Sequence, residues 1–131
     1  MGQSYDALDT IRMTPGGNRI LMLVDDEPAQ TRLVTALAAR AGWRTLGVSD
    51  ADSALETLET RDGMLLDAIL IDQAMPGGDT TSLISKIREL RPDLPILMLT
   101  ALSSVEVAVD AMRAGATDFL AKPIAPDRLL A

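Results

Sequence analysis

The stretch Asp67-Ala68-Ile69-Leu70-Ile71-Asp72 decides how this chain folds. Its four central residues are apolar, which predicts a strand buried on both faces, because a half-exposed strand alternates apolar with polar residues. The strand ends at one carboxylate, Asp72, and the following Pro76-Gly77-Gly78 predicts a turn. An acid at the carboxyl end of a buried strand lies where open α/β sheets place their ligands. Taken alone, Asp72 is equally typical of an ordinary loop acid.

Composition limits what the chain does. Its 131 residues suit one domain, and 47% are hydrophobic, which excludes a disordered chain. No apolar run approaches the roughly 20 residues of a membrane span, and the N-terminus lacks the basic and apolar regions of a signal peptide. We therefore expect a cytoplasmic protein that does not contact a membrane.

The missing residue types narrow the chemistry further. The chain has no Cys and no His, which excludes disulfides, thiolate metal sites and imidazole catalysis. A bound cation must then have oxygen ligands, which favours Mg²⁺ or the similar Mn²⁺. The net charge of −7 and the three aromatic residues argue against direct nucleic acid binding by this segment.

Periodicity divides the chain into an extension and a domain. Residues 1–19 show no sustained period and end in a loop composition, so we expect a flexible N-terminal extension before a domain at 20–131. Within the domain, apolar runs predict five strands, at 20–24, 43–48, 68–71, 96–99 and 118–121. Helices are expected to begin at Pro28, at Ser49 or Asp50, at Asp79 or Thr80, at Ser103 or Ser104, and at Pro126. Asp62-Gly63 is expected to close the second helix, and the end of the chain cuts the last one short.

The helices carry apolar residues at helical spacing, and these are expected to face inward. They are Leu33, Val34, Leu37, Ala38, Ala41, Ala54, Leu55, Leu58, Leu83, Ile84, Ile87, Leu90, Val105, Ala108, Val109 and Met112. Alternating strands and helices predict a parallel sheet with both faces covered, because the crossover connections are right-handed. The fold class is therefore α/β, a three-layer α/β/α sandwich whose strands follow the flavodoxin-like order 2-1-3-4-5.

The residues at the strand ends form a pattern. Asp25 and Asp26 follow the first strand, Asp72 ends the third, Thr100 the fourth, and Lys122 follows the fifth. In this strand order the acids are neighbours, and Lys122, on the outermost strand, has the longest reach. At about 5 Å and an effective dielectric of about 20, each carboxylate pair repels by about 3 kcal/mol, which a divalent cation would relieve. Helix capping is the alternative role for Asp25 or Asp26.

These groups suit phosphoryl transfer. A cation and Lys122 would neutralise phosphoryl oxygens, and Thr100 would donate a hydrogen bond. The central acid, Asp72, is the candidate nucleophile, because an ionised carboxylate needs no general base.

The pattern closely resembles the receiver domain of two-component response regulators, the CheY-like superfamily. The resemblance covers residues 20–131 and rests on Val24-Asp-Asp-Glu27, Ile71-Asp72, Met75-Pro-Gly77, Leu99-Thr-Ala101, Ala114-Gly-Ala116 and Phe119-Leu-Ala-Lys-Pro123. It implies that Asp72 accepts phosphate from a bacterial sensor histidine kinase. It also implies that Asp25, Asp26, Asp72 and the backbone carbonyl of Ala74 hold the metal, and that Thr100 and Lys122 contact the phosphoryl group.

The resemblance also implies a switch. Thr100 would turn toward the phosphoryl group, Phe119 would move into the vacated space, and the surface formed by the fourth helix, last strand and fifth helix would change. A plain core aromatic is the alternative for Phe119. Neither Ala74 nor Leu102 carries a group that orients water, so we expect a long-lived phosphorylated state.

The segment around Val107–Lys122 looks most like receivers attached to transcriptional output domains, so we expect a regulatory domain rather than an enzyme. A receiver of a hybrid kinase or phosphorelay is the alternative within the family. A haloacid-dehalogenase-like phosphatase also uses a strand-end Asp, but it would want an acid at Ala74. A phosphorylation-dependent homodimer through the fourth helix stays open, with burial of that helix face in the core as the alternative.

Overall fold

One parallel sheet organises the molecule. The computed structural model describes residues 19–74, 80–100 and 105–122. Its strands are β1 (Arg19–Val24), β2 (Trp43–Val48), β3 (Ala68–Asp72), β4 (Ile96–Thr100) and β5 (Asp118–Ala121). They pair in parallel in the order β2-β1-β3-β4-β5, which confirms the predicted fold class.

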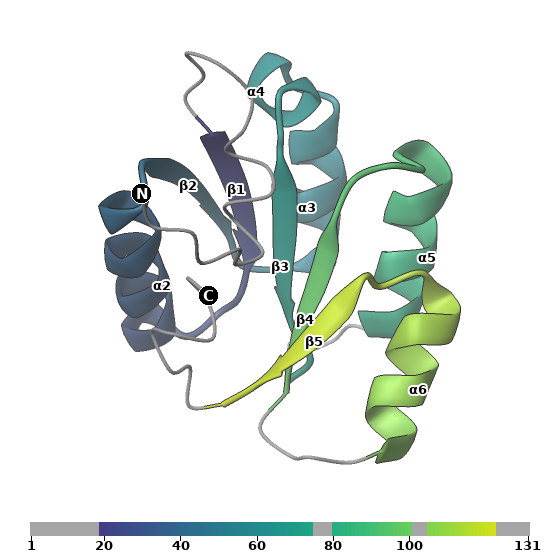
Figure 1. Ribbon diagram of the computed structural model, residues 1–131. Coiled ribbons are helices and arrows are strands. Elements are labelled where there is room, and N and C mark those ends of the chain that lie inside the picture. The colour runs from purple at the N-terminus through teal and green to yellow at the C-terminus, as the bar shows by residue number, and fades with distance from the viewer. Residues whose placement is uncertain (1–18, 75–79, 101–104, 123–131) are drawn as a thin grey trace, which may run out of the picture.

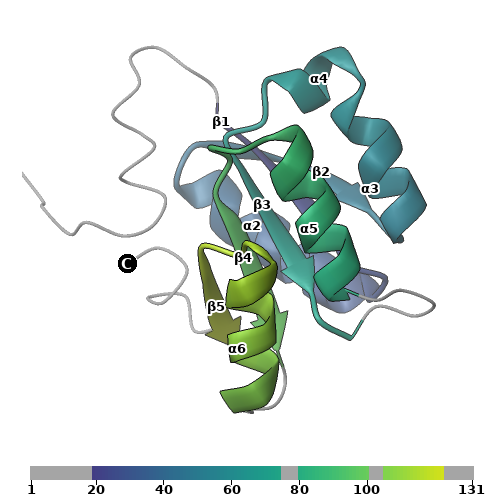
Figure 2. The same ribbon diagram turned by 90° about the vertical axis from the view of Figure 1, so that its right-hand side faces the viewer.

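Helices cover both faces of this sheet. The described helices are α2 (Pro28–Arg40), α3 (Ala51–Leu58), α4 (Arg61–Met64), α5 (Thr80–Leu90) and α6 (Val105–Ala114). In Figure 1, α2 lies on one side of the sheet and α3, α5 and α6 lie on the other. Turned by a quarter, the view in Figure 2 places α5 and α6 in front of the strands. None of the helices in the described ranges is long and apolar enough to cross a membrane.

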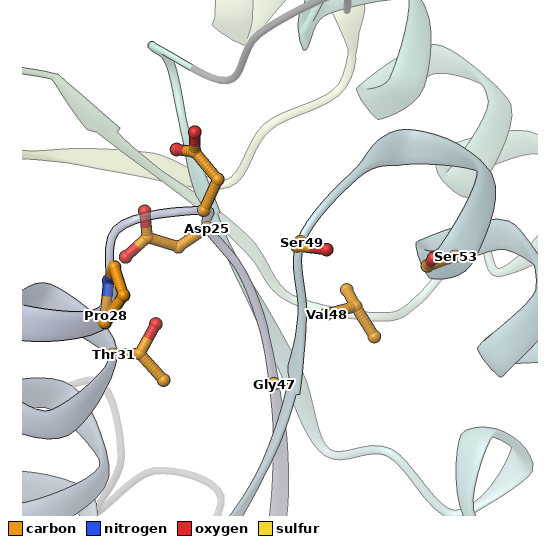
Figure 3. Close-up of a pocket in the computed structure, with 8 residues that line it drawn as sticks. Asp25, Pro28, Thr31, Gly47, Val48, Ser49 and Ser53 are labelled. Atoms are coloured by element: carbon orange, nitrogen blue, oxygen red, sulfur yellow. The ribbon is translucent and has the colours of Figure 1, made fainter.

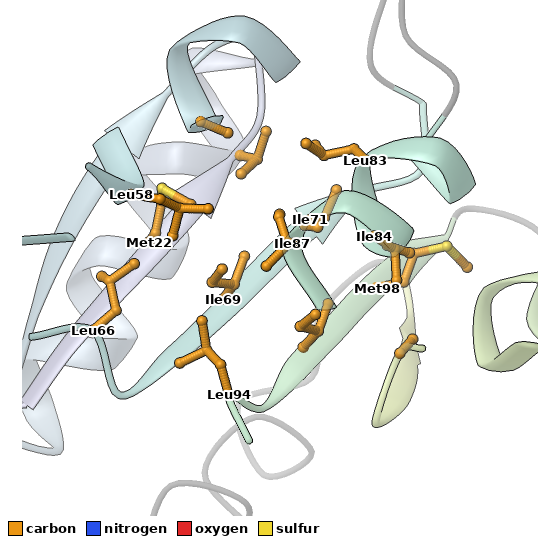
Figure 4. Close-up of a cluster of buried hydrophobic side chains, with 14 of the residues drawn as sticks. Met22, Leu58, Leu66, Ile69, Ile71, Leu83, Ile84, Ile87, Leu94 and Met98 are labelled. Atoms are coloured by element: carbon orange, nitrogen blue, oxygen red, sulfur yellow. The ribbon is translucent and has the colours of Figure 1, made fainter. Parts of the chain in front are cut away.

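The three central strands, β1, β3 and β4, are mostly apolar and buried along their whole length, because each of their faces packs against a helical layer. In β1, Leu21 and Leu23 join the core that includes α2 residues. Met22 and Val24 point the other way, into the larger core beneath α3 and α5. Figure 4 shows part of that core, where sheet residues such as Ile69 meet Ile87 of α5.

Among the side chains that the structure describes, which exclude that of Val105, four apolar residues predicted to face inward do not. The exposed fractions are 42% for Leu33, 60% for Leu90, 39% for Val109 and 44% for Met112. For α2 and α5 periodicity overestimated the buried stripe, because a helix contacts a flat sheet along a narrow line and its flanking positions stay in solvent. For α6 the predicted face was wrong, because Ala111, Val107 and Ala114 contact the core instead. Leu90 is also the last residue of α5.

The segment after α3 differs from the single helix that was predicted. The α3 helix ends at Leu58, and Thr60 then caps the short α4, its Oγ1 accepting the N–H of Gly63 at 3.0 Å. Gly63 therefore lies inside α4 rather than closing α3. A Cβ on Gly63 would collide with the backbone carbonyl of Thr57, so the close packing of this turn requires glycine.

Some predicted segments begin earlier than expected or lie outside the residues that the structure describes. The β1 strand begins at Arg19, one residue before the predicted boundary, and Arg19 is buried. The rest of the predicted extension lies outside the described residues. So do the turn at Pro76-Gly77-Gly78 and the helix expected from Pro126.

Candidate functional site

Two adjacent strand ends bring the acids together. Val24 of β1 pairs with Ile71 of β3, so Asp25 and Asp72 follow side by side at the carboxyl edge of the sheet. One carboxylate oxygen from each of Asp25, Asp26 and Asp72 lies within 4.8 Å of the others. Asp25 and Asp72 are only 5% and 2% exposed, whereas Asp26 is exposed.

Local backbone geometry fixes Asp25 at this edge. Its N–H donates to the carbonyl of Val48 at 2.9 Å, which ties it to the end of β2. Its Oδ1 accepts the N–H of Glu27 at 3.0 Å, which tightens the turn into α2. Pro28 then starts the helix, as predicted, because proline's fixed φ suits the first helical turn.

Lys122 reaches Asp72 from the outer strand. Its N–H donates to the carbonyl of Thr100 at 2.8 Å, and its Nζ lies 2.8 Å from Asp72 Oδ1. The same oxygen accepts the N–H of Ala74 at 2.9 Å. The ammonium, Asp72 and Thr100 therefore share one edge of the sheet, and Thr100 is buried.

One residue at the site was missed by sequence reasoning. Gln30, in the first turn of α2, places Nε2 2.9 Å from Asp25 Oδ2 and 3.1 Å from Asp72 Oδ2. Because carboxylates only accept hydrogen bonds, the amide must present its NH₂ to both. The only available signal was the position of Gln30 in the turn after the acids, which does not indicate where its side chain points.

The two buried acids have opposite pKa shifts. Burial raises the pKa of Asp25, and the negative charge of Asp72 adds to that effect despite hydrogen bonds from Glu27 and Gln30. Burial also acts to raise the pKa of Asp72, but hydrogen bonds from Lys122 and the Ala74 N–H outweigh it, so the pKa falls below its usual value. Asp72 is therefore an ionised carboxylate at neutral pH.

The donor set fits a hard divalent cation. Three carboxylates from two neighbouring strand ends offer oxygen ligands, the kind that such an ion prefers, within 4.8 Å of one another. Beside them lies a cleft of about 420 Å³ between the start of α2 and the start of α3. Figure 3 shows Asp25 and Pro28 on one side of this cleft and Ser49 and Ser53 on the other.

The remaining site predictions concern three positions. Ala74 is exposed and its backbone N–H donates to Asp72 Oδ1, while the metal-ligand role of its carbonyl stays a prediction. Phe119 of β5 is half-buried and packs against the larger core. Thr80, one of the two predicted starts of this helix, is buried and donates to the carbonyl of Gln73 at 3.1 Å, which ties the start of α5 to the residue after Asp72.

Comparisons with known proteins agree with this geometry. The family model described as the response regulator receiver domain matches residues 21–131. The transcriptional regulatory protein ZraR of Klebsiella oxytoca is 34% identical over 109 residues, which is 83% of this chain and 24% of that protein. FixJ of Bradyrhizobium diazoefficiens, also a transcriptional regulatory protein, is 34% identical over 119 residues, 91% of this chain and 56% of that protein.

A solved structure extends the likeness to the fold. The crystal structure of a putative response regulator from Chloroflexus aurantiacus has a TM-score of 0.79 and 31% identity, covering 87% of this chain and 93% of that one. The chain spans about a quarter of ZraR and about half of FixJ. These matches favour a receiver over the phosphatase that a strand-end acid left open. The chain belongs to the response regulator receiver domain family.

Proposed function

We propose that this domain is a phosphorylation-controlled switch in which Asp72 accepts a phosphoryl group from the phosphohistidine of a sensor histidine kinase. One observation carries the proposal. The Nζ of Lys122 lies 2.8 Å from a buried carboxylate that two further acids flank, at the carboxyl edge of a parallel sheet. Such a site combines a nucleophile with positive charge placed for phosphoryl oxygens.

The chemistry follows from the bonding of Asp72. One carboxylate oxygen attacks phosphorus, the phosphorus–nitrogen bond to the kinase imidazole breaks, and its electron pair returns to that nitrogen. The lowered pKa of Asp72 keeps the carboxylate ionised for this attack. Lys122 and the Thr100 hydroxyl would then contact phosphoryl oxygens. The acceptor belongs to the protein itself, so we propose a regulatory domain rather than an enzyme with an external substrate.

A divalent ion completes the proposed site. Asp25, Asp26, Asp72 and the carbonyl of Ala74 would hold Mg²⁺ (or Mn²⁺). When bound, the ion neutralises the carboxylates and the phosphoryl oxygens together. The close approach of the three carboxylates supports this assignment.

We propose that the signal leaves through the surface that α6, β5 and the fifth predicted helix would form. Thr100 would turn toward the phosphoryl group, and Phe119, which packs only partly in the core, would move inward. The output would be transcription, through a further domain, in the cytoplasm. The relatives ZraR and FixJ support this because both are transcriptional regulatory proteins.

A phosphorylation-dependent homodimer through α6 is part of the proposal. Val109 and Met112 are exposed in the structure, so burial in the core does not account for them. Sedimentation of the domain before and after phosphorylation tests this point. We expect dimers only in the phosphorylated sample, weakened by Met112→Lys.

Intact-mass spectrometry after incubation with acetyl phosphate and Mg²⁺ tests the central claim. We expect one added phosphoryl group, absent in Asp72→Asn and abolished by chelating the metal. Asp93→Asn is the matched control, because Asp93 is an exposed acid outside the site. Uptake that persists in Asp72→Asn would refute Asp72 as the acceptor.

A further inference from the structure

Gln30 makes contacts that the proposed reaction does not require. Its NH₂ group donates to Asp25 Oδ2 at 2.9 Å and to Asp72 Oδ2 at 3.1 Å, so one nitrogen bridges two carboxylates of the acidic cluster. Asp25 and Asp72 are both buried, so neither is well solvated on this side. The amide therefore supplies partial positive charge where two like charges meet.

An ordinary structural role does not explain this arrangement. A Gln at the third position of a helix usually turns back to accept the N–H of the capping residue. Here the capping residue is Glu27, and its N–H already donates to Asp25 Oδ1 at 3.0 Å. Gln30 is thus directed to the acids instead, from a helix that Asp25 itself anchors.

We infer that Gln30 is a positioning residue that occupies the cation's place in the metal-free domain. Its NH₂ bridges the carboxylate oxygens that would share the ion, and a bound cation displaces it. The inference rests on the proposed function, because it takes the acidic cluster as the metal site. It adds that this chain opposes metal binding through one side chain.

The two sides of Asp72 support this assignment. Oδ1 is held by the Lys122 ammonium and the Ala74 N–H, whereas Oδ2 accepts from the Gln30 amide that also donates to Asp25. Displacing the amide thus frees Oδ2 without disturbing the ion pair between Oδ1 and Lys122. In the metal-free domain, the bridging amide keeps the carboxylates of Asp25 and Asp72 close together.

Linkage then predicts a paired effect on stability and metal affinity. A group that stabilises only the metal-free state weakens metal binding by the same free energy. Gln30→Met keeps an unbranched side chain but donates no hydrogen bond. We expect it to bind Mg²⁺ roughly tenfold more tightly, because hydrogen bonds to charged groups are worth about one factor of ten or more.

The experiment measures both quantities. Mg²⁺ affinity is determined by calorimetry, and stability by urea unfolding with chelator present, for the parent, Gln30→Met and Gln30→Lys. We expect Gln30→Met to bind Mg²⁺ more tightly and to unfold more readily without metal. Gln30→Lys places a full charge between the acids and is expected to weaken Mg²⁺ binding at least tenfold.

Gln73→Met is the matched control. Gln73 is the neighbour of Asp72, but in the described part of the chain its side chain donates to neither Asp25 nor Asp72. Its substitution should leave Mg²⁺ affinity unchanged.

Three results would overturn the inference. Unchanged Mg²⁺ affinity in Gln30→Met would assign Gln30 a purely structural role. Weaker affinity would mean that its amide oxygen helps to hold the ion. A parent domain that binds no Mg²⁺ would refute the metal site itself, and the proposed function would fail with it, whereas the first two results leave that function standing.

Discussion

Replacing Lys122 by Met removes the positive charge beside the acceptor while keeping a side chain of similar length. In the parent, Lys122 Nζ lies 2.8 Å from Asp72 Oδ1, and the two side chains are 18% and 3% exposed. The ion pair is therefore largely desolvated. We expect Lys122→Met to destabilise the metal-free domain at neutral pH and to impair phosphoryl uptake.

The geometry sets the size of the loss. At 2.8 Å and an effective dielectric of about 20, the attraction is about 6 kcal/mol, much of which offsets the cost of desolvation. Breaking a buried pair usually costs about 3–5 kcal/mol, because one charge stays behind uncompensated. Asp72 keeps its hydrogen bonds from Ala74 and Gln30, so we expect the lower end, about 3 kcal/mol.

The loss depends on pH in a defined direction. The pKa of Asp72 is lowered in the folded parent, so ionised Asp72 contributes to the stability of the fold at pH values above its unfolded pKa of 3.8. This contribution to stability is lost as the pH falls through the lower pKa that Asp72 has in the folded state. Lys122→Met lacks the hydrogen bond and the positive charge that help to lower the pKa of Asp72 in the parent, so the stability difference between the two proteins should shrink in acid. Saturating Mg²⁺ should also reduce it.

Urea unfolding followed by fluorescence of Trp43 provides the assay, since Trp43 is the single tryptophan and is buried. A double-mutant cycle with Asp72→Asn isolates the pair, and we expect a coupling of at least about 2 kcal/mol. A loss below about 1 kcal/mol, the value of a surface ion pair, would contradict the reasoning. So would additive effects of the two substitutions.

Three further predictions concern the turns and the lifetime of the phosphorylated state. Gly115→Ala should lower the free energy of unfolding by about 2 kcal/mol, because φ is +122° and a Cβ would lie 2.9 Å from Arg88 Cγ. Gly42→Ala is the control: at φ +87°, with nothing within 4 Å of its Cβ, it should lower the free energy of unfolding by less in the same urea assay. Asp50 caps α3 by accepting the Ser53 N–H at 2.7 Å, and this hydrogen bond lowers the pKa of Asp50. The parent should therefore be more stable than Asp50→Asn at neutral pH and lose that advantage as the pH falls below 3.8. A stability advantage of the parent that grows in acid would contradict this prediction. Ala74→Asn combined with Leu102→Glu should shorten the lifetime of phosphorylated Asp72 by roughly tenfold or more, because the introduced amide and carboxylate orient a water molecule. Mass spectrometry over time follows the loss of the phosphoryl group, and an unchanged lifetime would contradict this role of the two positions. Leu102 itself lies outside the described residues.

Sequence patterns were enough to predict the sheet and the grouping of Asp25, Asp72 and Lys122 at its edge. Apolar runs such as Ile69–Ile71 identify strands locally, and alternation with helices leaves few topologies. Because parallel strands end at one edge, Asp25, Asp72 and Lys122 had to lie near one another once the strand order was known. The apolar runs and the rule that parallel strands end at one edge of the sheet were therefore enough to predict this grouping of side chains.

The tertiary structure alone decided how these groups contact one another. Gln30 is 42 residues from Asp72, and its hydrogen bond depends on the angle at which α2 leaves β1 and on one side-chain rotamer. The exposure of Leu33 depends on how narrowly α2 touches the sheet, and the need for glycine at Gly63 depends on its approach to Thr57. These features arise from packing between elements, which periodicity along a single element does not specify.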